Sequence, residues 1–526
     1  MSIAAQAAAP AEERLPLGLV IALVAMMCGN FIALLDIQIV ASAIGSIQAG
    51  VSASRDEISR VQSAYLIAEV IGIPLSGFLS RALGVRILFT GSALLFGLAS
   101  MLCAISWDMT SLVVFRALQG FVGAAMIPTT FATLYGVVPR SQQASIGMVV
   151  AMLSTLAPSL GPTLGGSIAE HLGWRTLFSI NLVPSLLIAG AVWRYMSAGQ
   201  QPNFPLLRKI DFIGLIGLAL FLGAFEYVLE EGPKNGWFED GHVVAWSAAC
   251  AAGAAMFFWR ALTQETPIVD LRPFTHRTFM IGAALTFLIG VGLFTPVFLQ
   301  PLFLVQVRGL NAEQIGHLMV AQGLAMAVIM ALGMPTVARL ADLRPVGFVG
   351  FFLVALSCWI ETHLTAQSDF WELLTPQILR GSGLVLTFMS VTQTTLQAMP
   401  PQIMQASTAL YNLCRNLGGA VGLAVGGTMQ THFFALHRQE LYTAAKLNDP
   451  NVHALIARHE AFLSASGAPD PHRQAILGYV GLLDREALVM SFNDQFLMLT
   501  LALAVASLGV WALKPAPFGA APVDAH

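Results

Sequence analysis

Single charged side chains lie inside long apolar stretches of this sequence. Asp36 occurs in FIALLDIQIV, Glu69 in QSAYLIAEVIGIP, and Glu226 in a third stretch of the same kind. A carboxylate within a membrane helix costs about 2.5–3.5 kcal/mol on insertion scales, so it needs water, a cation or a proton nearby. A group balanced between these states can bind and release a proton as its surroundings change. We therefore predict that these three carboxyl groups take part in proton coupling.

Arginines occur in similar surroundings. Arg116 belongs to FRALQG, and a guanidinium that stays charged is a suitable partner for a buried carboxylate. We therefore predict that Arg116 tunes the proton-coupling carboxylates. Further polar residues in apolar stretches are predicted to line a substrate cavity or to serve gating: Gln38, Gln119, Arg380, Asn412 and Arg415.

Other roles for these residues remain open. Asp36 would have a structural role if it accepted hydrogen bonds across a helix interface, and Glu226 would be an interfacial residue near the outer end of its stretch. An enzyme embedded in the membrane would concentrate acidic residues and histidines on adjacent helices, whereas these charges are spread singly. The sequence has no phosphate-binding GxxxxGK[ST] motif and no convincing metal-ligand spacing. We therefore expect no cofactor and no metal.

The composition defines the class of protein that holds these charges. Hydrophobic residues make up 56% of the 526 residues and charged residues 10%, whereas soluble domains carry about 25% charged residues. We predict an all-α polytopic membrane protein. Fourteen apolar runs approach the roughly 20 residues that a spanning helix needs. They are 17–45, 58–80, 84–106, 111–137, 142–168, 175–196, 209–230, 243–263, 279–306, 312–338, 344–364, 372–397, 403–433 and 493–514.

The distribution of Lys and Arg predicts the orientation. These residues concentrate in the short loops that are cytoplasmic if the N-terminus is cytoplasmic, as cytoplasmic loops generally require. Residues 1–16 and 515–526 are then cytoplasmic tails, and the loop 434–491 is periplasmic. The five cysteines lie in predicted spans and give no disulfide framework, and a net charge of −3 gives no indication of a nucleic-acid partner.

The chain also contains an internal duplication. FRALQGFVG (115–123) resembles PQILRGSGL (376–384) when Gly120 is aligned with Gly381, and GFLSRALGVR resembles ARLADLRPVG. The offset of eight helices predicts two six-helix bundles, at 17–196 and 279–514, with two further helices inserted in 197–263. Duplicated bundles around a central binding site are the architecture of secondary transporters.

The ordered motifs identify a family. The chain resembles the fourteen-helix drug:proton antiporters of the major facilitator superfamily, most closely the EmrB-type inner-membrane subunits of tripartite multidrug exporters. The resemblance covers nearly the whole chain. It rests on LLDIQIVASAI, IPLSGFLSRALG, FRALQG, LGPTLGG, EEGPKNGWF, TPIVDLRPF, YNLCRNLGGAVG and KPAPFGA.

The resemblance implies roles for two groups of glycines and charges. LGPTLGG matches the antiporter motif of the fifth helix, where Pro removes a backbone donor and Gly permits close packing. Its residues are Gly161, Pro162, Gly165 and Gly166. The loop after the second helix matches a cytoplasmic gate, in which the family often has Asp where this chain has Arg. The gate residues are Gly77, Arg81, Gly84 and Arg86, with Asp342 in the second half, so an asymmetric gate is expected.

The resemblance also implies a function. We expect proton-coupled efflux of drugs or other hydrophobic or amphipathic small molecules across the bacterial inner membrane, powered by the proton gradient. A periplasmic adaptor protein and an outer-membrane channel are the expected partners, and the loop 434–491 is well placed to touch the adaptor. One alternative is export of a dedicated organic acid or metabolite. Another is import by a protein of the same fold, which the GPTLGG motif disfavours.

Overall fold

The computed structural model is built from helices. It describes residues 15–51, 53, 58, 60–196, 202–208, 210–264, 267–310, 312–337, 340–368, 370–445, 450–466 and 469–515. Within this part of the chain every regular element is an α-helix or a short 3-10 helix. Most residues of the expected tails 1–16 and 515–526 lie outside the described residues.

The N-terminal half supplies the first nine helices of the described chain. They are α1 (Leu17–Ser42), α2 (Ile44–Val51), α4 (Arg60–Leu83), α5 (Val85–Ala104), α6 (Met109–Gly123), α7 (Met126–Val137), α8 (Arg140–Leu172), α9 (Thr176–Ser179) and α10 (Leu182–Tyr195). The fourth predicted span is interrupted between α6 and α7, and the sixth is divided into α9 and α10.

The remaining helices form the inserted segment and the C-terminal half. The insert contains α11 (Phe204–Leu207), α12 (Phe212–Glu231), η1 (Trp237–Glu239) and α13 (Gly241–Thr263), followed by η2 (Arg272–Thr275). The C-terminal half contains α14 (Arg277–Gln306), α15 (Ala312–Val337), α16 (Arg344–Glu361), α17 (Phe370–Leu396), η3 (Pro401–Ile403), α18 (Met404–Ala444), α19 (Pro450–Ala465), α20 (Pro471–Gly509) and η4 (Val510–Ala512).

The helices account for all fourteen predicted spans. In the described residues, eleven helical segments are long and apolar enough to cross a membrane, and α8, α17 and α18 cover the other three predicted spans. α17 carries many polar residues, but most of its side chains are buried among its neighbours. The chain is therefore a multi-pass membrane protein.

Glycines set the closest helix contacts in both halves. A Cβ atom at Gly165 would lie 2.5 Å from the backbone oxygen of Ile39, so α8 lies directly against α1. In the second half a Cβ at Gly418 would overlap the backbone of Phe287, and α18 lies equally close to α14. Small residues allow this approach because no side chain separates the two backbones.

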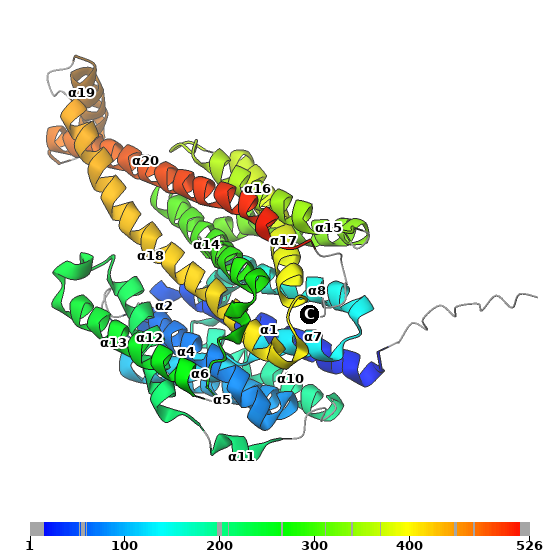
Figure 1. The fold of residues 1–526 in the computed structure, drawn as a ribbon. Helices are drawn as coiled ribbons and strands as arrows, with labels where there is room; N and C mark the ends of the chain where they lie inside the picture. Colours follow the sequence, from blue (N-terminus) through cyan, green and yellow to red (C-terminus); the bar gives the residue numbers. More distant parts are fainter. Residues whose placement is uncertain are drawn as a thin grey trace, which may run out of the picture.

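Several pairs of helices join the two halves, among them α4 with α18 and α8 with α15. Gly77 of α4 faces Ala409 of α18, and Gly323 of α15 faces Leu156 of α8. The inserted helices α12 and α13 pack on each other, and α12 packs against α4, at the edge where α4 meets α18 (Figure 1). The insert therefore lies beside the contact between the halves.

Most of the predicted connecting loop 434–491 is helical in the described residues. α18 continues to Ala444, α19 follows, and α20 begins at Pro471, 22 residues before the predicted start at 493. Figure 1 shows these helices projecting beyond the rest of the bundle. Contacts between α18 and α20 hold the projection together, including Arg438 Nε to Asp484 Oδ1 at 2.7 Å.

Candidate functional site

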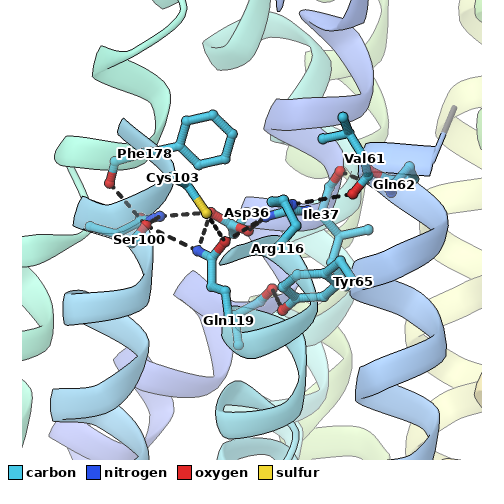
Figure 2. Close-up of polar contacts among 12 residues, drawn as sticks. Asp36, Ile37, Val61, Gln62, Tyr65, Ser100, Cys103, Arg116, Gln119 and Phe178 are labelled. Carbon is cyan, nitrogen blue, oxygen red and sulfur yellow. Dashed lines mark hydrogen bonds and ion pairs between the residues drawn. The ribbon is translucent and has the colours of Figure 1, made fainter. Parts of the chain in front are cut away.

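Asp36 and Arg116 form an ion pair inside the N-terminal half. Asp36 lies on α1 and Arg116 on α6, and the Arg116 Nη1 atom is 2.6 Å from Asp36 Oδ2. Both side chains are fully buried, at 0% exposure. Figure 2 shows the two side chains pointing toward each other between their helices. The structure therefore gives the isolated carboxylate of α1 a cationic partner.

The second oxygen of Asp36 is also paired. Asn181 Nδ2 donates to Asp36 Oδ1 at 2.7 Å, and Gln119 Nε2 donates to the same oxygen at 3.2 Å. Both amides also donate to Ser100 Oγ at 3.0 Å, and Ser100 donates to the Phe178 backbone oxygen at 2.9 Å. The ionised carboxylate is thus fully satisfied in this arrangement.

Further contacts fix the guanidinium of Arg116. Its Nη1 also donates to Gln119 Oε1 at 2.7 Å, and its Nε reaches the Val61 backbone oxygen at 3.5 Å. The guanidinium lies 4.2 Å from the ring centre of Tyr65, a distance at which a cation interacts with the ring face. Within the described residues Nη2 has no hydrogen-bond partner. The cation is therefore held on several sides by α4 and α6.

Local sequence features place α6 against α4. Asp108 caps the start of α6 by accepting a hydrogen bond from the Ser111 backbone nitrogen at 2.7 Å. Ser111 Oγ accepts from the Asp108 nitrogen in return, which completes a reciprocal cap. Gly120 then allows close packing, because a Cβ there would overlap the Tyr65 backbone oxygen. This contact brings Arg116 and Gln119 level with Asp36.

Glu69 lies between charges of the two halves. It is buried on α4, one turn beyond Tyr65, and interacts electrostatically with Arg415 of α18 and with Arg116. Arg415 is buried at 2% exposure, and in the described residues its Nε and Nη2 atoms have no hydrogen-bond partner. Asn412 donates to the Thr408 backbone oxygen at 2.9 Å, within the same helix.

Glu226 is buried on the inserted helix α12. It interacts electrostatically with Glu230, one turn further along α12, and with Glu69 of α4. Its exposure is 5%, and its Oε2 atom has no partner in the described residues. The structure thus places Glu226 in helix packing and adds Glu230, which the sequence did not single out.

The antiporter-motif glycines pack α8 against α1. A Cβ at Gly161 would overlap the Cβ of Gln38, and Gly165 faces Ile39 and Ser42 one turn away. Gln38 is thus half-buried against α8. The motif also contains Gly166, which is partly buried, and Pro162, whose side chain lies outside the described part.

The cytoplasmic gate residues have different partners in the two halves. Arg81 Nη2 lies 3.4 Å from the Pro267 backbone oxygen, in the segment that joins the insert to α14. Asp342 instead pairs with Arg344, the first residue of α16, at 2.8 Å. Gly84 has φ +78°, a conformation that side chains disfavour, at the start of α5. The contacts of the two loops therefore differ.

Arg86 contacts α10. Its guanidinium lies 4.5 Å from the ring centre of Trp193 and donates to the Trp193 backbone oxygen. This contact ties the start of α5 to the end of α10. A Cβ atom added at Gly77 would lie 3.8 Å from the Cβ of Ala409, where α4 meets α18.

Arg380 lies inside the C-terminal half. It pairs with Glu361 of α16, and its Nη1 donates to Gln300 Oε1 of α14 at 2.9 Å. Glu361 was not among the residues expected from the sequence, although it lies inside the predicted span 344–364 and is the last residue of α16. Asn181 and Ser100 were not expected either, because a neutral polar residue in a membrane helix is a weak signal.

Comparisons with known proteins agree with this architecture. The model of the Major Facilitator Superfamily matches residues 26–423. The colistin resistance protein EmrB of Acinetobacter baumannii is 40% identical over 416 residues, 78% of this chain and 80% of that protein. The multidrug export protein EmrB of Escherichia coli K12 is 28% identical, over 95% of this chain and 96% of its own.

A solved structure supports the fold alone. The human organic anion transporter MFSD10 has a TM-score of 0.57 at 14% identity, with 93% of this chain and 100% of that chain covered. The family match extends over more than half of the sequence and includes Asp36 and Arg116. The chain therefore belongs to the Major Facilitator Superfamily, and within it to the EmrB-type exporters that its motifs resemble.

Proposed function

We propose that this protein exports hydrophobic or amphipathic small molecules in exchange for protons, by alternating access between its two halves. The observation that carries the proposal is the fully buried Asp36–Arg116 pair. A charge held at this depth in a membrane protein is costly unless it has a function or a partner, and a carboxylate can exchange a proton. The names of the EmrB relatives support drugs as the class of substrate.

Proton binding at Asp36 would change how several helices are held together. The ionised carboxylate accepts hydrogen bonds from Arg116 of α6, from Gln119 of α6 and from Asn181 at the start of α10. A protonated carboxyl group becomes a donor at one oxygen and loses its attraction for the guanidinium. Protonation therefore weakens the contact of α1 with α6, and this change can bias the equilibrium between two states of the transporter.

Glu69 provides the link from this pair to the second half. It interacts electrostatically with both Arg116 and Arg415, and Arg415 belongs to α18, which packs against α4. A change of charge at the Asp36–Arg116 pair therefore alters the field at the contact between the halves. Glu226 of the inserted helix α12 interacts electrostatically with Glu69 of α4 and is proposed as a further proton-coupling group.

The cellular setting is part of the proposal. The excess of Lys and Arg in alternate short loops supports cytoplasmic termini, and the Gram-negative relatives support a location in the bacterial inner membrane. The helical projection formed by α19 and the adjoining ends of α18 and α20 then lies in the periplasm. A periplasmic adaptor protein, joined to an outer-membrane channel, is the partner we propose for it.

Transport by inverted membrane vesicles tests the coupling. Substrates from a panel of cationic drugs and organic anions are added to energised vesicles, and proton movement is followed with a pH-sensitive dye. Asp36→Asn should abolish substrate-induced proton movement at an unchanged level of protein in the membrane. Glu239→Gln, at an exposed position of η1, is the matched control and should behave as the wild type. Wild-type coupling in Asp36→Asn would refute the assignment.

A further inference from the structure

The internal duplication relates a second buried network to the first. Aligning Gly120 with Gly381 places Arg116 opposite Gln377 and Gln119 opposite Arg380. The structure supports this alignment through the same helix contact in each half. A Cβ at Gly120 would overlap a backbone oxygen of α4, and a Cβ at Gly381 would overlap a backbone oxygen of α15, the corresponding helix.

The second network contains the same kinds of chemical group, but the arginine and a glutamine have exchanged positions along the aligned helix. Arg380 of α17 forms an ion pair with Glu361 of α16, and it donates to Gln300 Oε1 of α14 at 2.9 Å. Gln377 of α17 also donates to Gln300 Oε1. All four side chains are completely buried. Each half therefore holds one carboxylate, one guanidinium and amide side chains away from solvent.

The two carboxylates differ in how completely they are paired. Both oxygens of Asp36 accept hydrogen bonds, whereas within the described residues Glu361 Oε1 is buried without a partner. The Gln377 Oε1 atom of the same network is also a buried acceptor that has no donor among the described residues. A proton on Glu361 Oε1 would convert one of these acceptors into a donor. A neutral carboxyl group would thus leave fewer unpaired acceptors in this network, which among the described residues also holds two unpaired donors, Gln300 Nε2 and Arg380 Nε.

The surroundings of Glu361 contain few other charges. Arg380 is the cation that faces it, and the thiol of Cys358 interacts with it from one turn earlier on α16. From α14 the network receives the amide of Gln300, and from α20 Asn493 donates to the Leu364 backbone oxygen near the end of α16. No other carboxylate interacts with Glu361 in the part of the chain that the structure describes.

The network also lies near one end of the helices that carry it. Glu361 is the last residue of α16, and Gln300 lies six residues before the end of α14. In the orientation proposed above, both positions are near the periplasmic ends of their helices. Asp36 likewise lies six residues before the end of α1. Both carboxylates are therefore close to the side from which protons enter in an exporter driven by the proton gradient.

We propose that Glu361 is a proton-binding carboxyl group in the C-terminal half of this transporter, with Arg380 as its counter-ion. The inference rests on the proposed proton-coupled export. A proton from the periplasm binds Glu361 Oε1, the neutral carboxyl group loses its charge attraction for Arg380, and the same proton leaves toward the cytoplasm later in the cycle. The C-terminal half then contributes one proton in addition to the proton bound by the N-terminal half.

Infrared difference spectroscopy tests the binding of this proton directly, without substrate. The wild-type protein in lipid nanodiscs is titrated, and the carbonyl stretch of protonated carboxyl groups is recorded against pH. Glu361→Gln should lose one titrating component, and Asp36→Asn should lose a different one. An unchanged spectrum in folded Glu361→Gln protein would overturn the proposal. Glu239→Gln, which changes an exposed carboxylate, should retain both components.

The number of protons moved per substrate gives the second measurement. In proteoliposomes this ratio should fall by one in Glu361→Gln. Because that variant leaves Arg380 unpaired and can fail to fold, Glu361→Gln with Arg380→Gln removes both charges together and should give the same fall. A wild-type ratio in the double variant would show that the pair only packs the helices.

The two proposals fail in different ways. If Asp36→Asn abolishes coupling and the Glu361 variants keep the wild-type ratio, only the second proton site is rejected. If Asp36→Asn keeps full coupling as well, the proposed function itself is rejected. If the Glu361 variants lower the ratio and Asp36→Asn abolishes coupling, both proposals are supported.

Discussion

Asp36 accepts hydrogen bonds from three side chains, and its pairing with Arg116 decides how it can act. Both partners are completely buried, so the attraction between them is weakly screened and the cost of separating them is high. Breaking a buried pair by removing one partner typically costs about 3–5 kcal/mol, because the remaining charge is uncompensated. A proton on Asp36 neutralises the carboxylate but likewise leaves the buried cation of Arg116 uncompensated. Protonation therefore requires that the guanidinium gain another partner or water, which couples proton binding to a rearrangement of the helices.

Removing the cation should change the pH dependence of transport. In Arg116→Ala the carboxylate of Asp36 has no counter-ion, so the pH profile of transport should move to higher pH. Arg116→Lys keeps a charge but loses the planar contacts to Asp36 and Gln119, so a smaller shift is expected. Transport rate against pH in proteoliposomes, at matched protein density, measures both shifts. An equal loss of rate at every pH in Arg116→Ala would indicate a structural residue.

Glycine contacts determine how the helices present these residues. Gly120 brings α6 onto α4, and Gly161 and Gly165 bring α8 onto α1, the helix that carries Asp36. A side chain at any of these positions has no room, because backbone or Cβ atoms of the neighbouring helix occupy the space. The spacing of the glycines thus controls the distance between the charged groups.

A substitution at Gly120 should separate the two helices. Gly120→Val places its side chain against the Tyr65 backbone, and we expect a loss of about 1–3 kcal/mol of stability together with weaker coupling. Gly91→Ala on α5 is the control, since a Cβ there meets nothing within 4 Å. The melting temperature of the detergent-solubilised proteins and their transport rates test this. Equal melting temperatures for Gly120→Val and the wild type would contradict the role given to this contact.

The helical projection has its own pH-sensitive contact between α18 and α20. His437 lies beyond the predicted span 403–433; partial burial opposes its charge, but hydrogen bonds to Asp494 at 2.7 Å and to Glu440 at 3.2 Å raise its pKa overall. A raised pKa in the folded state gives stability that is fully present below the unfolded pKa of about 6.5. This stability is lost as the pH rises through the folded pKa.

His437→Gln should therefore destabilise the projection in acid only. The expected difference from the wild type is at most about 1 kcal/mol, because the acidic partners are partly exposed. Hydrogen exchange of α19 between pH 5 and 8, corrected for the intrinsic rate, measures the difference. A difference between the two proteins that grows toward pH 8 would contradict a raised pKa of His437 in the folded state.

The arrangement of the whole molecule sets which groups reach which compartment. The projection and the segment 267–276 lie at opposite ends of the bundle, since α18 and α14 both run from one end to the other (Figure 1). In the proposed orientation the projection is periplasmic and the segment is cytoplasmic. Arg81 binds Pro267 in that segment, so the gate contact is expected on the cytoplasmic side.

Cysteine labelling tests this orientation. In a variant without the five native cysteines, Ser464→Cys on α19 should react with an impermeant thiol reagent in cells whose outer membrane is permeabilised. Thr275→Cys, also at an exposed position, should react only after the inner membrane is opened. The reverse pattern would place the termini outside.

The sequence by itself determined the class of the protein and most of its helices. Apolar runs long enough to span a bilayer define membrane helices, because backbone groups in lipid must pair within the segment. The isolation of Asp36 and Arg116 in such runs also marked both as functional candidates. The helical part of 434–491 carries polar surface, so a search for apolar runs does not find it as a membrane span.

Only the tertiary structure decided which of these groups are partners. Asp36 and Arg116 are 80 residues apart, Asn181 is 145 residues from Asp36, and no local spacing relates them. Glu361 and Arg380 are closer in sequence, but their pairing depends on how α16 packs on α17. Hydrogen bonds and ion pairs act over a few ångströms, so partners on different helices are chosen by helix packing. That packing brings each carboxylate to one guanidinium and leaves Glu361 Oε1, within the described residues, without the donors that Asp36 has.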